Sequence, residues 1–98
     1  MTTTGRPVML LLDLLSQRWT LRILWELHLA APTPLTFRAL QERCEDMSSS
    51  VLSRRLSSLR EARIVTADAG YALADEGARL IALLLPLDAW ARDWAASG

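Results

Sequence analysis

The chain lacks lysine and has very little cysteine and histidine, and each shortage excludes a class of protein. All 11 basic residues are arginines, and 11 acidic residues balance them, so the formal net charge is +0. A globally basic nucleic-acid-binding protein is therefore excluded, whereas a locally basic one is not. The single cysteine, Cys44, excludes an internal disulfide framework and a cysteine-rich zinc site. The single histidine, His28, has no second ligand at metal-binding spacing, so we expect no metal, no cofactor and no enzymatic activity.

Long hydrophobic runs are also missing. The longest, Leu80–Leu87, is far shorter than the roughly 20 residues that span a bilayer, and Pro86 interrupts it. The apolar stretch after Arg6 is broken by Asp13 and lacks a cleavage site, which argues against a signal peptide. Hydrophobic residues still make up 51% of the 98 residues, so part of the apolar surface is expected to meet a partner. We expect one cytoplasmic domain over residues 1–98, without membrane contact and with residues 1–6 disordered.

The apolar periodicity predicts a mostly α fold with a small β-hairpin. Helices are expected over residues 8–17, 19–29, 37–44, 48–62 and 75–94, and strands over 64–66 and 71–73. Thr36 is a predicted N-cap, and Pro86 is expected to kink the last helix. The first helix is apolar on nearly every side and is therefore predicted to be buried on nearly every side. Three clustered helices followed by a hairpin are typical of a winged helix-turn-helix, in which helix 48–62 recognises DNA.

The positive charge is concentrated in that predicted recognition segment. Residues 48–66 contain four arginines and one glutamate, a local charge of +3, whereas residues 67–78 carry −3. With Leu52, Leu56 and Leu59 facing the core, the opposite face of the helix carries Ser50, Ser53, Arg54, Ser57 and Glu61. Arginine can bond guanine in two places, and serines can bond phosphates or base edges. The predicted DNA-binding residues are Arg38, Ser48, Ser49, Ser50, Ser53, Arg54, Arg55 and Ser57; a solvated helix face without function is the alternative.

Four stretches of the sequence resemble the HxlR family of winged-helix transcription regulators, which are related to the MarR group. The stretches are residues 15–27, 35–40, 47–65 and 71–90. The resemblance implies a homodimer that binds a palindromic operator, usually as a repressor. Because residues 8–15 and 80–87 are apolar on nearly every side, we expect the first and last helices to join the two copies. Three departures stand out. The family's glycine after the recognition helix is Arg63, so we expect its left-handed helix stop to be lost. The hairpin carries no basic residue, and no cysteine precedes the first helix.

The chain contains 4 tryptophans, a high number for its length. Trp19 and Trp90 match family positions and are expected in the core, whereas Trp25 stands where the family usually has a polar residue. Aromatic side chains on these helices indicate dimer packing or the wall of a pocket for a small planar effector. The residues of that candidate pocket are Leu21, Trp25, His28, Leu29, Trp90 and Trp94. The alternative function is accordingly a winged-helix domain that no longer binds DNA and that binds, or acts on, a planar ligand in an aromatic dimer cavity.

Overall fold

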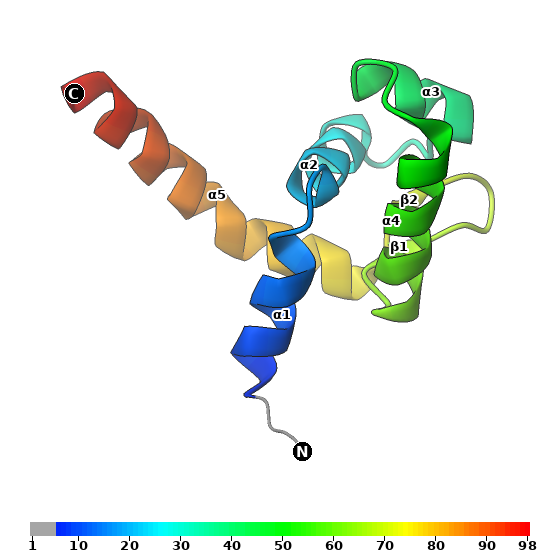
Figure 1. Ribbon diagram of the computed structural model, residues 1–98, viewed down its shortest axis with the longest axis horizontal. Coiled ribbons are helices and arrows are strands. Elements are labelled where there is room, and N and C mark those ends of the chain that lie inside the picture. Colours follow the sequence, from blue (N-terminus) through cyan, green and yellow to red (C-terminus); the bar gives the residue numbers. More distant parts are fainter. Residues whose placement is uncertain (1–5) are drawn as a thin grey trace.

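The computed structural model describes residues 6–98, which form five helices and a two-stranded antiparallel hairpin (Figure 1). The elements are α1 Pro7–Leu15, α2 Thr20–Ala30, α3 Phe37–Arg43, α4 Ser49–Glu61, β1 Val65–Thr66, β2 Ala72–Leu73 and α5 Asp75–Ser97. The predicted order of elements and the winged helix-turn-helix fold are confirmed. The expectation of disorder over 1–6 falls on residues outside the described part except at Arg6, which is the N-cap of α1.

Side-chain caps fix where the two helices of the helix-turn-helix begin. The hydroxyl of Thr36 accepts a hydrogen bond from the backbone N–H of Ala39 at 3.0 Å, which confirms the predicted N-cap of α3. The hydroxyl of Ser48 accepts one from the N–H of Val51 at 3.4 Å and caps α4. The predicted inward face of α4 is also confirmed, because Leu52, Leu56 and Leu59 are buried in the core.

The end of α4 corrects the prediction that the left-handed helix stop is lost. Arg63 itself adopts a φ of 63°, in the region where glycine is usual. The N–H of Arg63 bonds the carbonyl of Arg60, and the N–H of Ile64 bonds the carbonyl of Leu59, both at 2.9 Å. These are the two bonds of a Schellman motif, and Ile64 is buried behind them. The helix stop therefore survives without glycine, because hydrogen bonds and burial offset the strain of a side chain in this conformation.

Each strand of the hairpin is one residue shorter than predicted, and Tyr71 pairs outside the hairpin. Val65 pairs with Leu73 and Thr66 with Ala72. Tyr71 instead forms an isolated bridge with Leu35, with backbone hydrogen bonds of 2.7 and 2.9 Å. The hairpin is thus tied to the segment between α2 and α3.

A close approach of two backbones places α5 against the end of α4. A Cβ atom on Gly77 would lie 2.1 Å from the carbonyl oxygen of Ile64, so only glycine fits there. The same carbonyl accepts a hydrogen bond from the N–H of Ala74 at 2.9 Å. The start of α5 is therefore fixed to the turn that carries Arg63.

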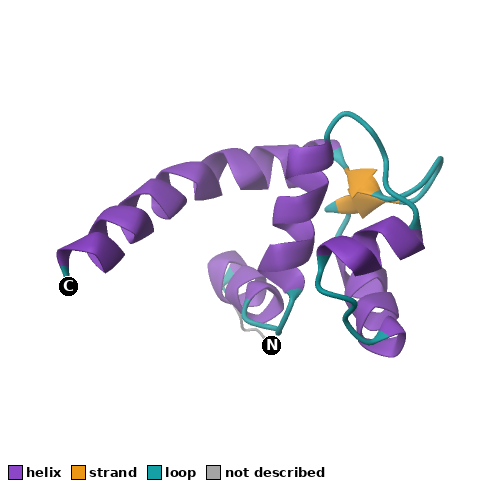
Figure 2. Cartoon of the chain, turned by 90° about the horizontal axis from the view of Figure 1, so that it is seen from above, coloured by secondary structure: helices purple, strands orange, loops and turns teal. Residues whose placement is uncertain are grey.

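The two terminal helices correct the prediction of burial for the first helix. No residue of α1 is buried, and Leu10 is 64% exposed. In α5, Leu83 is 76% exposed, and Trp90, expected in the core, is 61% exposed. The core is filled by α2, α3, α4, the hairpin and the first turns of α5, so α1 and the second half of α5 extend away from it (Figure 1). The helix α5 continues through Pro86, and Figure 2 shows that it is curved.

Candidate nucleic-acid interface

The exposed face of α4 carries short hydroxyl side chains around one arginine. Ser50, Ser53, Arg54, Ser57 and Glu61 are exposed on the side of α4 away from the buried leucines, and Ser49 is exposed at the N-terminus of the helix. Within residues 6–98, Arg54 forms neither an ion pair nor a hydrogen bond, so its guanidinium keeps all its donors free. Serines beside it leave room for another molecule's backbone to approach the helix closely. The structure thus brings together the central residues of the predicted DNA-binding set.

The other two predicted arginines already have contacts within the chain. The Nε of Arg55 donates to the carbonyl oxygen of Arg18 at 2.8 Å, which ties α4 to the connection between α1 and α2. Arg38 pairs with Glu42 at 3.5 Å on α3. Both members of that pair are more than half exposed, and such pairs contribute little to stability. Arg38 can therefore exchange its partner for a phosphate without a large cost, whereas Arg55 cannot do so without giving up its bond to Arg18.

A network centred on Arg22, which the sequence analysis did not identify, holds the turn of the helix-turn-helix. Its Nε contacts Glu26 at 3.0 Å, one terminal nitrogen contacts Glu45 at 2.9 Å, and the other donates to the carbonyl oxygen of Arg43 at 2.8 Å. The hydrogen bond that Arg22 donates to Glu26, followed by the one that it donates to Glu45, raises the pKa of the Arg22 guanidinium. This side chain therefore joins α2 to the C-terminal end of α3. The i,i+4 spacing of Arg22 and Glu26 was the only sequence signal available.

The turn that Arg22 holds is strained. Glu45 and Asp46 have φ values of 60° and 54°, a left-handed conformation that side chains other than glycine rarely adopt. Cys44, which precedes them, is completely buried, and burial raises the pKa of its thiol. A second hydrogen bond across this turn comes from the side-chain amide of Gln41, which donates to the carbonyl oxygen of Met47 at 2.8 Å. Such a conformation persists only where the surroundings fix it, and these bonds do so.

The hairpin adds acidic rather than basic groups beside α4. Ser57 and Arg60 of α4 face Thr66 and Asp68 across a hollow of about 480 Å³. Asp68 is exposed, and Gly70 makes the turn with a φ of 113°. A negative charge at this position repels phosphate, so the hairpin is poorly suited to contact a nucleic-acid backbone.

The candidate aromatic pocket is not assembled within one chain. Leu21 and Trp25 line a cleft between α2 and α5, whereas His28 lines a different cavity near the hairpin. The rings of Trp90 and Trp94 stack on each other, with 5.8 Å between their centroids, on the exposed part of α5. Leu29 is 57% exposed.

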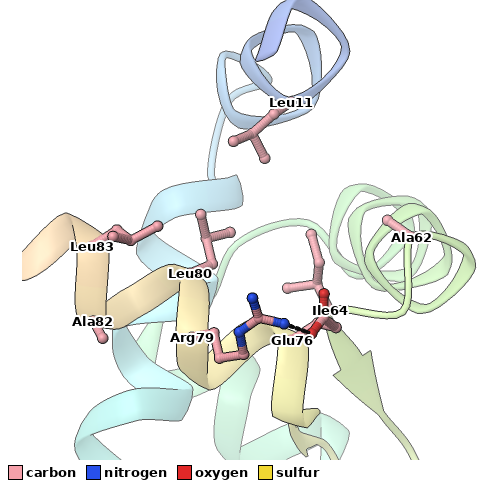
Figure 3. A pocket seen from close by; sticks show the side chains of 8 residues that line it. All are labelled: Leu11, Ala62, Ile64, Glu76, Arg79, Leu80, Ala82 and Leu83. Atoms are coloured by element: carbon pink, nitrogen blue, oxygen red, sulfur yellow. Dashed lines mark hydrogen bonds and ion pairs between the residues drawn. The ribbon is translucent and has the colours of Figure 1, made fainter. Parts of the chain in front are cut away.

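Another hollow of about 550 Å³ lies between α1, the end of α4 and α5 (Figure 3). Leu11 of α1 faces Leu80 across it, and the Glu76–Arg79 ion pair lies at its edge. Over residues 6–98, no three His, Cys, Asp or Glu side chains are grouped to hold a metal ion. In the same part of the chain, no helix is both long and apolar enough to span a membrane.

Comparison with known proteins identifies the family. A family model described as HxlR-like helix-turn-helix matches residues 14–98. Quinone-bound YodB from B. subtilis is 28% identical with a TM-score of 0.76, over 91% of this chain and 99% of that one. The reduced transcriptional regulator YodB is 26% identical with a TM-score of 0.75, over 97% and 99%.

A possible HxlR family transcriptional factor from Thermoplasma volcanium GSS1 is 26% identical with a TM-score of 0.79, over 94% of this chain and 87% of that one. No curated protein matches the chain. The matched family model covers most of the chain, and these solved structures align with 91–97% of it. The chain therefore belongs to the HxlR-like helix-turn-helix family of DNA-binding transcription regulators.

Proposed function

We propose that the protein is a cytoplasmic, non-enzymatic repressor that binds a palindromic operator as a homodimer. The observation that carries this proposal is the exposed face of α4, where Arg54 is free to contact a base between Ser50, Ser53 and Ser57. In a helix-turn-helix protein, the second helix of the motif enters the major groove and contacts base edges. Arg54 bonds a guanine through O6 and N7, and Ser48 and Ser49 at the N-terminus of α4 bond phosphates.

Exposed apolar residues on the terminal helices support the homodimer. Leu10 of α1 and Leu83 of α5 are each more than half exposed, and Leu83 lines the hollow that lies between α1 and α5. A helix of a second copy that covers these residues also closes the hollow between α1 and α5 (Figure 3). Two-fold pairing through these helices gives two recognition helices, which bind half-sites about 34 Å apart on one side of the DNA. The palindromic operator follows from that symmetry.

The proposal is tested by measuring the affinity of purified protein for selected duplexes by fluorescence anisotropy. Arg54→Ala is expected to cost about 1–3 kcal/mol on the selected operator and to relax the preference at one base pair of each half-site. Arg92→Ala on α5 is the charge-matched control and should leave sequence preference unchanged. Equal losses for both variants on operator and random DNA would show that Arg54 reads no base.

The second candidate function is a winged-helix domain that no longer binds DNA and that binds, or acts on, a small planar ligand. The acidic hairpin with Asp68 favours it, as does the cleft lined by Leu21 and Trp25. A neighbour of the same fold, YodB, has been solved with a quinone bound. If the wild-type protein shows no affinity for any duplex at low salt, this second function replaces the first.

A further inference from the structure

The cleft between α2 and α5 has the size and lining of a site for a small molecule. It has a volume of about 400 Å³, within the range of small-molecule pockets. One wall is formed by Leu21, Arg22 and Trp25 of α2, and the other includes Leu84 and Asp88 of α5. Apolar side chains therefore surround the indole of Trp25, the guanidinium of Arg22 and the carboxylate of Asp88. The two charged groups determine which charge a ligand can carry.

The guanidinium of Arg22 already has partners within the chain for all three of its nitrogens. Its three nitrogens contact Glu26, Glu45 and the carbonyl oxygen of Arg43 at 2.8–3.0 Å. Two carboxylates already balance its single positive charge. An anionic ligand in the cleft would have to displace these contacts, so the site does not favour anions.

The carboxylate of Asp88 is the available charge. Its partner within residues 6–98 is Arg92, one helical turn further along α5 at 3.0 Å, whose side chain is 75% exposed. Exposed pairs of this kind contribute little, so Arg92 can turn into solvent when another cation arrives. Trp25 lines the same cleft, and an indole attracts a cation to its ring face more strongly than any other aromatic side chain.

We propose that this cleft binds a small aromatic cation, whose ring packs against Trp25 and Leu84 and whose positive charge pairs with Asp88. The ligand class follows from the charge complementarity with Asp88 and from the occupied state of Arg22. This binding does not depend on DNA recognition. A second copy of the chain that fills the cleft with its own side chains is the competing occupant.

The test uses three probes that share a phenyl ring and differ in charge: benzyltrimethylammonium, benzyl alcohol and phenylacetate. Each is titrated into the full chain at low salt, and binding is followed by the NMR shift of the Trp25 indole N–H, assigned by its loss in Trp25→Leu. The cation should bind about fivefold or more tightly than either other probe. Asp88→Asn should reduce that advantage to about twofold or less without changing the affinity for benzyl alcohol.

Asp93→Asn, an exposed site on the same helix, is the matched control and should behave as wild type in every titration. Thermal unfolding of each variant confirms that it is folded. The proposal is overturned if phenylacetate binds as tightly as the cation, if Asp88→Asn leaves the preference intact, or if no probe shifts the Trp25 signal. In the last case, a Trp25→Leu variant that sediments as a monomer would identify a second copy as the occupant. Operator affinity measured on the same samples keeps the outcome separate from the proposed function.

Discussion

Replacing Arg63 with glycine should stabilise the protein. An L-residue in the left-handed region costs about 1–2 kcal/mol, and Arg63 occupies that region at a φ of 63°. Glycine removes this strain but gives the unfolded chain more freedom, which costs roughly 0.5–1 kcal/mol. The two hydrogen bonds of the helix stop involve only backbone atoms and are unaffected. The expected net gain is therefore about 0.5–1 kcal/mol.

Urea unfolding at a fixed protein concentration measures this gain, because association would otherwise change the apparent stability. The midpoint should rise with an unchanged slope, and the melting temperature should rise by about 2–8 °C for a chain of this size. Arg63→Ala separates strain from charge: it keeps the Cβ atom and should change stability by only about 0.5 kcal/mol or less.

Arg60→Gly provides the opposite control, because Arg60 lies within the helix. Glycine there should destabilise by about 1 kcal/mol relative to alanine. The reasoning fails if Arg63→Gly is no more stable than Arg63→Ala, since the strain assigned to the Cβ atom would then be absent.

Four further outcomes are expected. Leu83→Arg should yield a folded monomer in sedimentation velocity, because this leucine is 76% exposed and lies on the proposed dimer surface; an unchanged dimer would contradict that surface. Arg38→Ala should weaken binding to all duplexes alike and reduce the salt slope by about 1, and a change in base preference would exclude a phosphate contact. Burial raises the pKa of the Cys44 thiol above its ordinary 9.0, so the folded state keeps the proton that the unfolded state loses. Stability should therefore fall as the pH rises from about 9 towards that raised pKa, and Cys44→Ala should flatten this decline. Thr20→Val should stabilise the chain by about 1 kcal/mol in urea unfolding, because the buried hydroxyl has no hydrogen-bond partner within residues 6–98, and a loss of stability would point to an undetected partner.

The order of the elements and the inner face of α4 could be predicted because they depend on local patterns. Leucines at helical spacing, such as Leu56, indicate the buried face of a helix. Hydroxyl side chains such as Thr36 and Ser48 indicate where a helix begins. The left-handed conformation of Arg63 could not be predicted in this way. It depends on the burial of Ile64 and on hydrogen bonds that only the folded chain provides.

The candidate sites were predicted unevenly for a similar physical reason. Exposure of Arg54 follows from the helical projection, whereas the bond from Arg55 to the carbonyl of Arg18 joins residues 37 positions apart. The contact between Arg22 and Glu45 spans 23 positions and carries no periodic signal. The prediction that the first helix is buried within the chain was wrong. An apolar pattern shows that a helix has hydrophobic surface, but it does not show whether residues of the same chain bury that surface.

The acidic hairpin has a consequence for how the protein finds its target in a chromosome. Attraction to phosphates supplies most of the affinity for random DNA, and each basic contact adds to it. If the protein binds an operator as proposed, Asp68 beside α4 and a total charge of +0 weaken that background attraction. Fewer molecules would then be held on random sequences, and a smaller number of copies would suffice to fill the operator. The corresponding cost is a shorter sliding distance along the duplex, which makes the search depend more on repeated encounters from solution.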